Sequence, residues 1–180
     1  QAPVRQCGEH DQSFTEIADQ RTPLQNYIAE RNNTGGTLRT YRLAIAGNEE
    51  FTALYSNNIN NAYSAIVNYA NNMAAVYRIE LCISFQLVSG TNIVYSSVPI
   101  AGDDPYDNDD QGAMLDENHT NLSSVMGLSS FDIGHVLGYT GGSGGGVAYA
   151  ESVCYDPWKS SGVSGIGNIA QYPQVFFDQL

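Results

Sequence analysis

Basic residues are scarce in this chain. It has 7 Lys and Arg against 19 Asp and Glu in 180 residues, which gives a formal net charge of −12. Binding to nucleic acid or to an anionic membrane surface requires clustered Lys and Arg, and the few basic residues here do not cluster. The composition therefore argues against nucleic acid and membranes as partners.

Long apolar runs and cysteines are also few. No run is long enough to span a bilayer, and the chain starts with Gln1-Ala-Pro, as a processed secreted protein does. Three cysteines are too few for a disulfide scaffold, and the odd number leaves at least one without a partner in this chain. The 42% of hydrophobic residues predicts a folded domain, which we expect to be secreted and extracellular.

Periodicity predicts an α/β fold. Residues 38–46 alternate as a strand, Asn48 is expected to cap one long amphipathic helix reaching about residue 76, and residues 79–88 alternate again. A strand, a helix and a strand in succession predict a parallel pair. The other expected elements are a short strand at 93–95, a helix at about 114–125, and strands at 131–137 and 147–153.

Two regions of the chain differ in composition. Residues 1–36 are polar and contain Pro3, Pro23 and a Gly-Gly pair, so we expect an N-terminal extension or pro-segment with one short helix at 22–31. Residues 37–180 carry all the strong periodicity. They are expected to form the folded domain.

Several ordered motifs indicate a family. They are Asp132-Ile-Gly-His-Val-Leu137, a glycine run, Gly146-Val-Ala-Tyr-Ala-Glu-Ser-Val-Cys154 and Ser161-Gly-Val163. Together they resemble the reprolysin- or adamalysin-like metzincin peptidases, above all the bacterial secreted branch, over roughly residues 38–170. The resemblance implies a metzincin-like upper subdomain: a twisted mixed sheet of about five strands with an antiparallel edge strand and two main helices.

The resemblance also implies a substrate-binding strand. In such peptidases the edge strand borders the active-site cleft, and a peptide lies antiparallel to it. By this analogy the strand after Asp132 would be that edge, and the backbone of Gly134, His135, Val136 and Leu137 would bind substrate. The alternative is a strand with a structural role only.

The zinc motif of the family, HExxHxxGxxH, does not occur in the chain. Laid over residues 131–141, only His135 and Gly138 match it, and one imidazole cannot hold a catalytic zinc ion. We therefore expect no catalytic residue in this chain, and we expect the chain to be truncated before the zinc helix. Zinc would belong to the missing part, or to a second chain that carries the C-terminal half.

Cys7 has two interpretations. The run Arg5-Gln-Cys7-Gly8-Glu-His-Asp11 resembles a cysteine switch, in which a thiolate occupies the open position of zinc and keeps a zymogen inactive. The alternative is an ordinary disulfide with Cys82 or Cys154.

The acidic loop at 103–112 is a candidate calcium site. Asp103, Asp107 and Asp109 precede Gly112, a pattern close to that of a calcium loop, although position 118 is Asn and not Glu. The alternative is a solvated acidic loop.

Two functions follow from these observations. The first is the N-terminal subdomain of a secreted zinc-dependent endopeptidase, which provides the strand that binds a peptide or protein substrate but not the zinc ligands. The second is a catalytically inactive metzincin-like module for extracellular assembly or binding, including self-assembly by strand addition.

Overall fold

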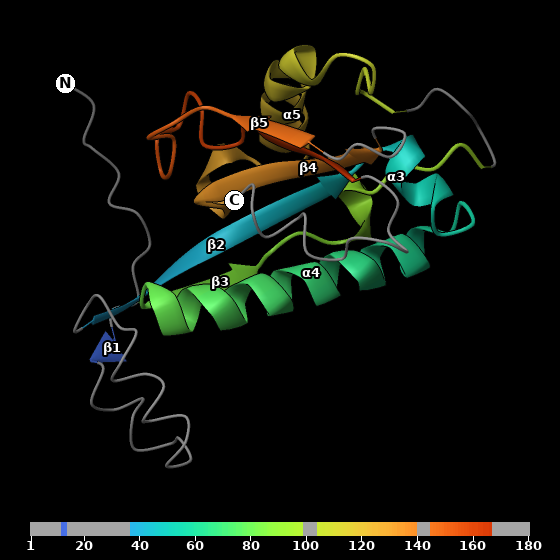
Figure 1. Cartoon of the computed structure of the whole chain (residues 1–180). Helices are drawn as coiled ribbons and strands as arrows, with labels where there is room; N and C mark the ends of the chain where they lie inside the picture. Colours follow the sequence, from blue (N-terminus) through green and yellow to red (C-terminus); the bar gives the residue numbers. More distant parts are fainter. Residues whose placement is uncertain (1–11, 14–36, 99–103, 140–144, 167–180) are drawn as a thin grey trace.

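One mixed β-sheet with a long helix on each face organises the molecule (Figure 1). The computed structural model describes residues 12–13, 37–98, 104–139 and 145–166. The expected short helix at 22–31 and most of the expected extension lie outside these residues. This architecture confirms the expected α/β fold with a five-stranded mixed sheet.

The strands follow the order β3-β2-β4-β6-β5 across the sheet. The first four are mutually parallel, and β5 pairs antiparallel with β6. A two-residue strand, β1 (Gln12–Ser13), adds antiparallel to the start of β2. The bounds are β2 Thr37–Gly47, β3 Ile83–Leu87, β4 Ile133–Tyr139, β5 Gly145–Ala148 and β6 Gly162–Ile166.

The helix expected after Asn48 is two helices. Asn48 does cap the first, α3 (Glu49–Ala53), because its side chain accepts the Phe51 N–H at 2.8 Å. The chain then turns through Ser56 and Asn57, whose φ angles of 62° and 54° lie in the left-handed region, which breaks the helix. The second helix, α4, begins at Ile59 after a new cap at Asn58.

The segment after α4 also departs from expectation. Helix α4 (Ile59–Glu80) continues into residues expected to be a strand, and β3 begins only at Ile83. Cys82 joins the two elements with a φ of 57°. The strand expected at 93–95 is reduced to a single parallel bridge between Gly47 and Val94, which follows a short 3₁₀ helix, η1 (Thr91–Ile93).

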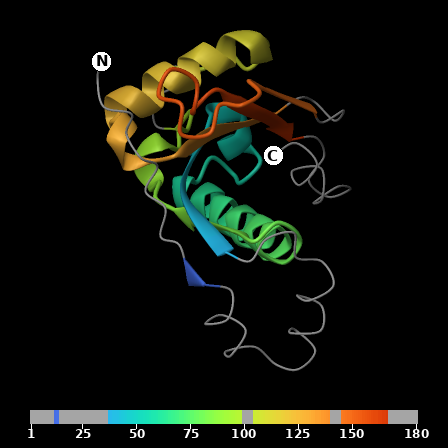
Figure 2. The same ribbon diagram turned by 90° about the vertical axis from the view of Figure 1, so that its left-hand side faces the viewer.

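Side chains from the two faces of β2 pack in two separate hydrophobic cores. Leu43 and Ile45 pack against α4 on one face, while Ala44 and Ala46 face α5 (Gln111–Val125) on the other. Figure 2 shows the two helices on opposite sides of the sheet. The helix expected at 114–125 is thus confirmed, with Asp110 as its cap.

An asparagine side chain closes the C-terminal end of β4. The Asn108 amide donates to the Tyr139 carbonyl at 2.7 Å, and its Oδ1 accepts the Tyr139 N–H at 3.0 Å. Asn48 donates to the same Oδ1 at 2.8 Å. The carboxamide therefore takes the place of a neighbouring strand at this point.

The strand expected at 147–153 is shorter and lies earlier, as β5. After Ala148 the chain makes a series of turns and returns as β6, which periodicity did not predict. Among the helices that the structure describes, none is both long and apolar enough to cross a bilayer.

Candidate functional site

The strand that carries Gly134, His135, Val136 and Leu137 lies inside the sheet. It is β4, which pairs with β2 on one side and β6 on the other, and the Gly134 N–H donates to the Lys159 carbonyl at 2.6 Å. All four residues are buried. The expectation that this segment is the antiparallel edge strand is wrong, because a strand bonded on both sides has no free edge.

His135 is a packed core residue. Its Nε2 lies 2.8 Å from the Ser164 hydroxyl, and a Cβ at Gly162 would come within 2.6 Å of its Nδ1. Complete burial lowers the pKa of His135 from 6.5 to about 4, so the ring is neutral at neutral pH. A neutral, enclosed imidazole suits packing and not substrate contact.

Asp132, the first residue of the motif, joins two strands. Its carboxylate accepts the backbone N–H of Arg42 at 2.8 Å and two guanidinium N–H groups at 3.1 and 2.7 Å. Burial acts to raise the pKa of Asp132, but the hydrogen bonds and charge of Arg42 outweigh it and lower that pKa below its ordinary value. The motif residues thus hold the sheet together.

The antiparallel edge strand is β5. It pairs with β6 on one side, and no other strand in the described part of the chain pairs with it. The register continues to Tyr149, whose N–H donates to the Ser161 carbonyl at 3.2 Å. Because the direction of backbone groups alternates, the N–H and C=O of Gly146 and Ala148 point away from β6. These two residues form the free edge.

The loop between β5 and β6, residues 149–161, is fastened to the sheet. The Cys154 N–H donates to the Asp132 carbonyl at 2.9 Å, and Cys154 is disulfide-bonded. The buried Lys159 ammonium donates to Asp156 at 2.6 Å and to the Leu128 carbonyl at 2.5 Å, and it lies 5.0 Å from the centre of the Phe131 ring.

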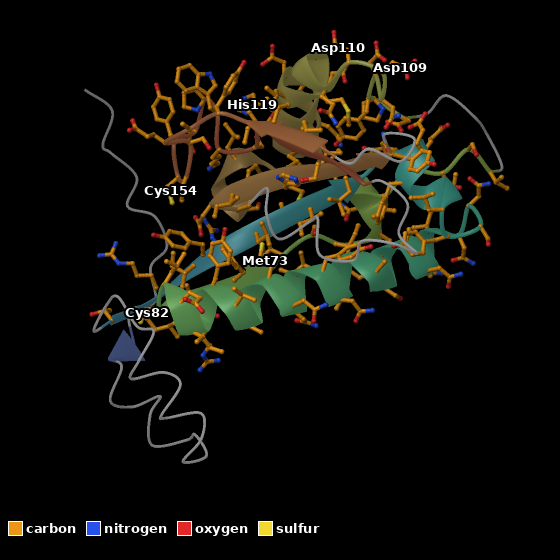
Figure 3. The ribbon with its side chains drawn as sticks, in the orientation of Figure 1. Met73, Cys82, Asp109, Asp110, His119 and Cys154 are labelled. Atoms are coloured by element: carbon orange, nitrogen blue, oxygen red, sulfur yellow. The ribbon has the colours of Figure 1, made fainter. Side chains whose placement is uncertain are left out.

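Three aromatic side chains stand on this loop, and we call Tyr149, Tyr155 and Trp158 the aromatic cluster. The ring centroids of Tyr149 and Trp158 lie 5.6 Å apart, and those of Tyr155 and Trp158 lie 5.3 Å apart. All three are between 41% and 49% exposed. Figure 3 shows the side chains of this loop projecting from the sheet, on the side of the molecule where Cys154 is labelled.

The acidic loop uses its carboxylates locally. Asp107 accepts the Asp109 N–H at 3.1 Å, and the Asp107 N–H donates to Glu117 at 2.8 Å. Asp110 caps α5, beside Asp109 in Figure 3. Asp103 lies outside the described residues. Within the described ranges, no three His, Cys, Asp or Glu residues are placed to hold a metal ion.

Asp104, in the same loop, is a partly buried carboxylate. It accepts the Glu49 N–H at 2.5 Å and the Tyr106 N–H at 2.8 Å. Burial raises the pKa of Asp104 to about 6 against the opposing effect of these two bonds. The side chain links the loop to the start of α3.

The histidines of the described part do not fit a zinc site. His119 lies with its Nδ1 2.9 Å from the Ser160 hydroxyl, and His135 is enclosed beside Ser164. No carboxylate or thiol joins either ring in a group suited to a metal. His10 and Cys7, with the proposed cysteine switch, lie outside the described residues.

The comparison with known families decides the relationship. The sequence profile of the metallo-peptidase family M12B, reprolysin-like, matches residues 37–178, which include every described element from β2 to β6. The chain belongs to this family. A reprolysin-like peptidase takes protein or peptide substrates, and the complete enzyme uses zinc. No curated protein matches the chain.

Sequence reasoning missed the two parts of the site that are accessible. The free edge at Gly146 and Ala148 lay within the quoted family motif, but its place at the sheet edge depends on strand order. The aromatic cluster had a visible signal, since its three members fall within ten positions of a glycine-flanked loop. Large aromatic side chains in a loop are a sign of a binding surface.

Proposed function

We propose that this chain supplies the substrate-binding strand of a secreted, zinc-dependent reprolysin-like endopeptidase, and that a peptide adds to β5. The observation that carries the proposal is the free side of this antiparallel edge strand, where Gly146 and Ala148 direct their backbone groups outward. An extended peptide can satisfy those groups by forming one more strand.

The shape of β5 supports close approach of a peptide backbone. Gly145 and Gly146 have no side chains, and a Cβ at Gly145 would meet nothing within 4 Å. The main chain would supply most of the hydrogen bonds, so binding at the edge itself would tolerate many sequences. Secretion is supported by the disulfide at Cys154, since disulfides persist in oxidising compartments.

The described residues support binding without hydrolysis. His135 is buried and neutral, and no group of metal ligands is present in the described ranges. Zinc and the general base would come from outside these residues. We therefore expect the 180-residue chain to bind a peptide without cleaving it, so that the mass of the peptide stays unchanged when zinc is added.

The test uses a short extended peptide and two N-methylated versions of it. The two versions carry N-methyl groups on opposite alternating sets of amides, so only one of them blocks the bonds to Gly146 and Ala148. We expect that version to bind about tenfold more weakly or worse in calorimetry, which corresponds to the loss of about 1.4 kcal/mol. The other version should bind like the unmodified peptide.

The amide NMR signals of Gly146 and Ala148 provide a second readout, because they should shift on peptide binding. Equal affinity of all three peptides would contradict the proposal. Sedimentation over a range of concentrations addresses the assembly alternative. Dimers that form through β5 would compete with the peptide and be lost in Ala148→Pro, which removes an outward N–H.

A further inference from the structure

Exposed apolar side chains are concentrated next to the free edge. Ten large hydrophobic or aromatic residues are exposed in the described part of the chain, and five of them lie within residues 147–158. These five are Val147, Tyr149, Val153, Tyr155 and Trp158. Single exposed apolar residues are ordinary, but a contiguous group indicates an interaction surface.

The aromatic cluster is held in place before any ligand arrives. The Trp158 and Lys159 N–H groups donate to the Tyr155 carbonyl at 2.9 and 2.8 Å. Lys159 is itself anchored beneath the loop by Asp156 and the Leu128 carbonyl. A surface that is already ordered loses little conformational entropy on binding. Exposure here is therefore combined with rigidity.

The cluster continues the free edge along one face of the sheet. Val147 pairs in register with Val163, which packs in the core beneath α5, so both side chains are on the α5 face. Tyr149 follows two residues later on the same face. A peptide strand beside β5 would bring its side chains on this face against Val147 and Tyr149, and then against the other two rings.

The charges around the cluster favour a basic neighbour. Lys159 is the only basic residue in residues 145–166, and it is buried in an ion pair with Asp156 at 2.6 Å. Glu151 is exposed on the same loop, and the whole chain carries −12. A Lys or Arg side chain gains from this field and can also lie over a Tyr or Trp ring.

We propose that the aromatic cluster is a specificity subsite that takes a large apolar or aromatic side chain of the peptide, with a Lys or Arg beside it. The inference rests on the proposed function, because the peptide strand on β5 delivers that side chain to the cluster. The subsite adds sequence preference to a backbone interaction that has little of its own.

The chain contains its own reporter for this test. Trp158 is the only tryptophan, so intrinsic tryptophan fluorescence comes from the cluster alone. We would titrate the 180-residue chain with an extended Lys-Phe-Lys peptide, and with matched peptides in which Ala replaces Phe or Glu replaces both Lys. The Phe peptide should give a saturable change in fluorescence, with at least about tenfold higher affinity than the Ala peptide. The peptide with Glu in place of both Lys residues should bind more weakly than the Ala peptide.

Variants of the protein separate the subsite from the strand edge. Tyr149→Ala and Tyr155→Ala keep the reporter, and each should abolish the preference for Phe over Ala. The Ala peptide should lose only a little affinity, because its Lys residues can still lie over the remaining rings. Tyr155→Phe should retain the preference. Leu81→Ala, at an equally exposed apolar residue outside the loop, is the matched control and should change neither affinity.

Different failures have different meanings. If the Phe and Ala peptides bind equally but the N-methyl effect persists, the subsite is wrong and strand addition stands. If N-methylation has no effect, strand addition fails, and the inference fails with it. A saturable response to a soluble oligosaccharide, with none to any peptide, would overturn the inference in favour of sugar binding.

Discussion

β4 and β5 lie on either side of β6 and have opposite environments. Five of the seven residues of β4 are buried and its backbone is bonded on both sides, whereas no residue of β5 is buried and one side of its backbone is free. The motif that resembles a peptidase falls at β4: His135 lies in this strand and Asp132 immediately precedes it. Those two ionisable side chains maintain the fold, while the free backbone edge belongs to β5, a strand of Gly, Val and Ala.

Proline should separate the two strands most strongly. In Val136→Pro the lost N–H and the rigid ring fall in a strand bonded on both sides, so we expect a cost above about 3 kcal/mol and no folded protein. In Ala148→Pro the lost N–H points to the free edge, and the protein should remain folded. Circular dichroism and thermal melting of both variants measure the difference. Loss of the folded state in Ala148→Pro as well would show that β5 is not an edge.

A single methyl group gives the next largest contrast. A Cβ at Gly134 would lie 2.6 Å from atoms of Leu122 and Ser160, whereas one at Gly145 would meet nothing within 4 Å. We expect Gly134→Ala to lower the free energy of unfolding by about 3 kcal/mol through overpacking. Gly145→Ala should change it by less than about 0.5 kcal/mol. Urea denaturation of both variants provides the measurement.

The buried imidazole of β4 predicts a loss of stability in acid. The pKa of His135 is about 4 in the folded state and near 6.5 in the unfolded state, so the unfolded state binds more protons between these values. Stability should therefore be complete above pH 6.5, fall as the pH drops towards 4, and lose at most about 3 kcal/mol from this group. Chemical denaturation across this pH range measures the fall.

A control is needed because Asp104 acts in the opposite direction. Its folded pKa is raised to about 6 from 3.8, so it makes the protein less stable as the pH rises through that range. The comparison of wild type with His135→Gln isolates the histidine, since Asp104 is common to both. The variant should lack the fall below pH 6.5. An equal slope in both proteins would assign the acid sensitivity to another group.

The smallest contrast concerns two valines that face each other across β5 and β6. Val163 is buried, so Val163→Ala should cost about 2 kcal/mol. Val147 is 38% exposed, and Val147→Ala should cost less than about 0.5 kcal/mol. Urea midpoints measured under the same conditions compare the two. A larger cost at Val147 would mean that this side chain is covered.

Local signals were predictable where one interaction sets the structure. The strand before Asn48 and the cap that Asn48 makes both followed from periodicity and side-chain chemistry, as did α5. The break in the next helix did not, because Ser56 and Asn57 interrupt a pattern of apolar residues that is otherwise suitable for a helix. Tertiary packing decides such turns, and no local pattern contains it.

Strand order was the part that could not be predicted. The family resemblance placed the edge of the sheet at the strand after Asp132, but the glycines of this strand admit close neighbours and His135 is enclosed beside Ser164. No periodic pattern marks β6, because this strand is short and rich in glycine and serine. Because β6 lies between β4 and β5, the observed edge strand β5 is two strands away from the predicted edge at β4.

The structure at the C-terminal end of β4 depends on the carboxamide of Asn108, which bonds the backbone of Tyr139. An asparagine deamidates slowly to aspartate as a protein ages, and a carboxylate has no hydrogen to give to the Tyr139 carbonyl that Asn108 now holds at 2.7 Å. The change would place a carboxylate oxygen of residue 108 against the Tyr139 carbonyl oxygen, and the two would repel each other. It would also add a negative charge to a chain that already carries −12. Deamidation of Asn108 would therefore weaken the C-terminal end of β4 in older molecules.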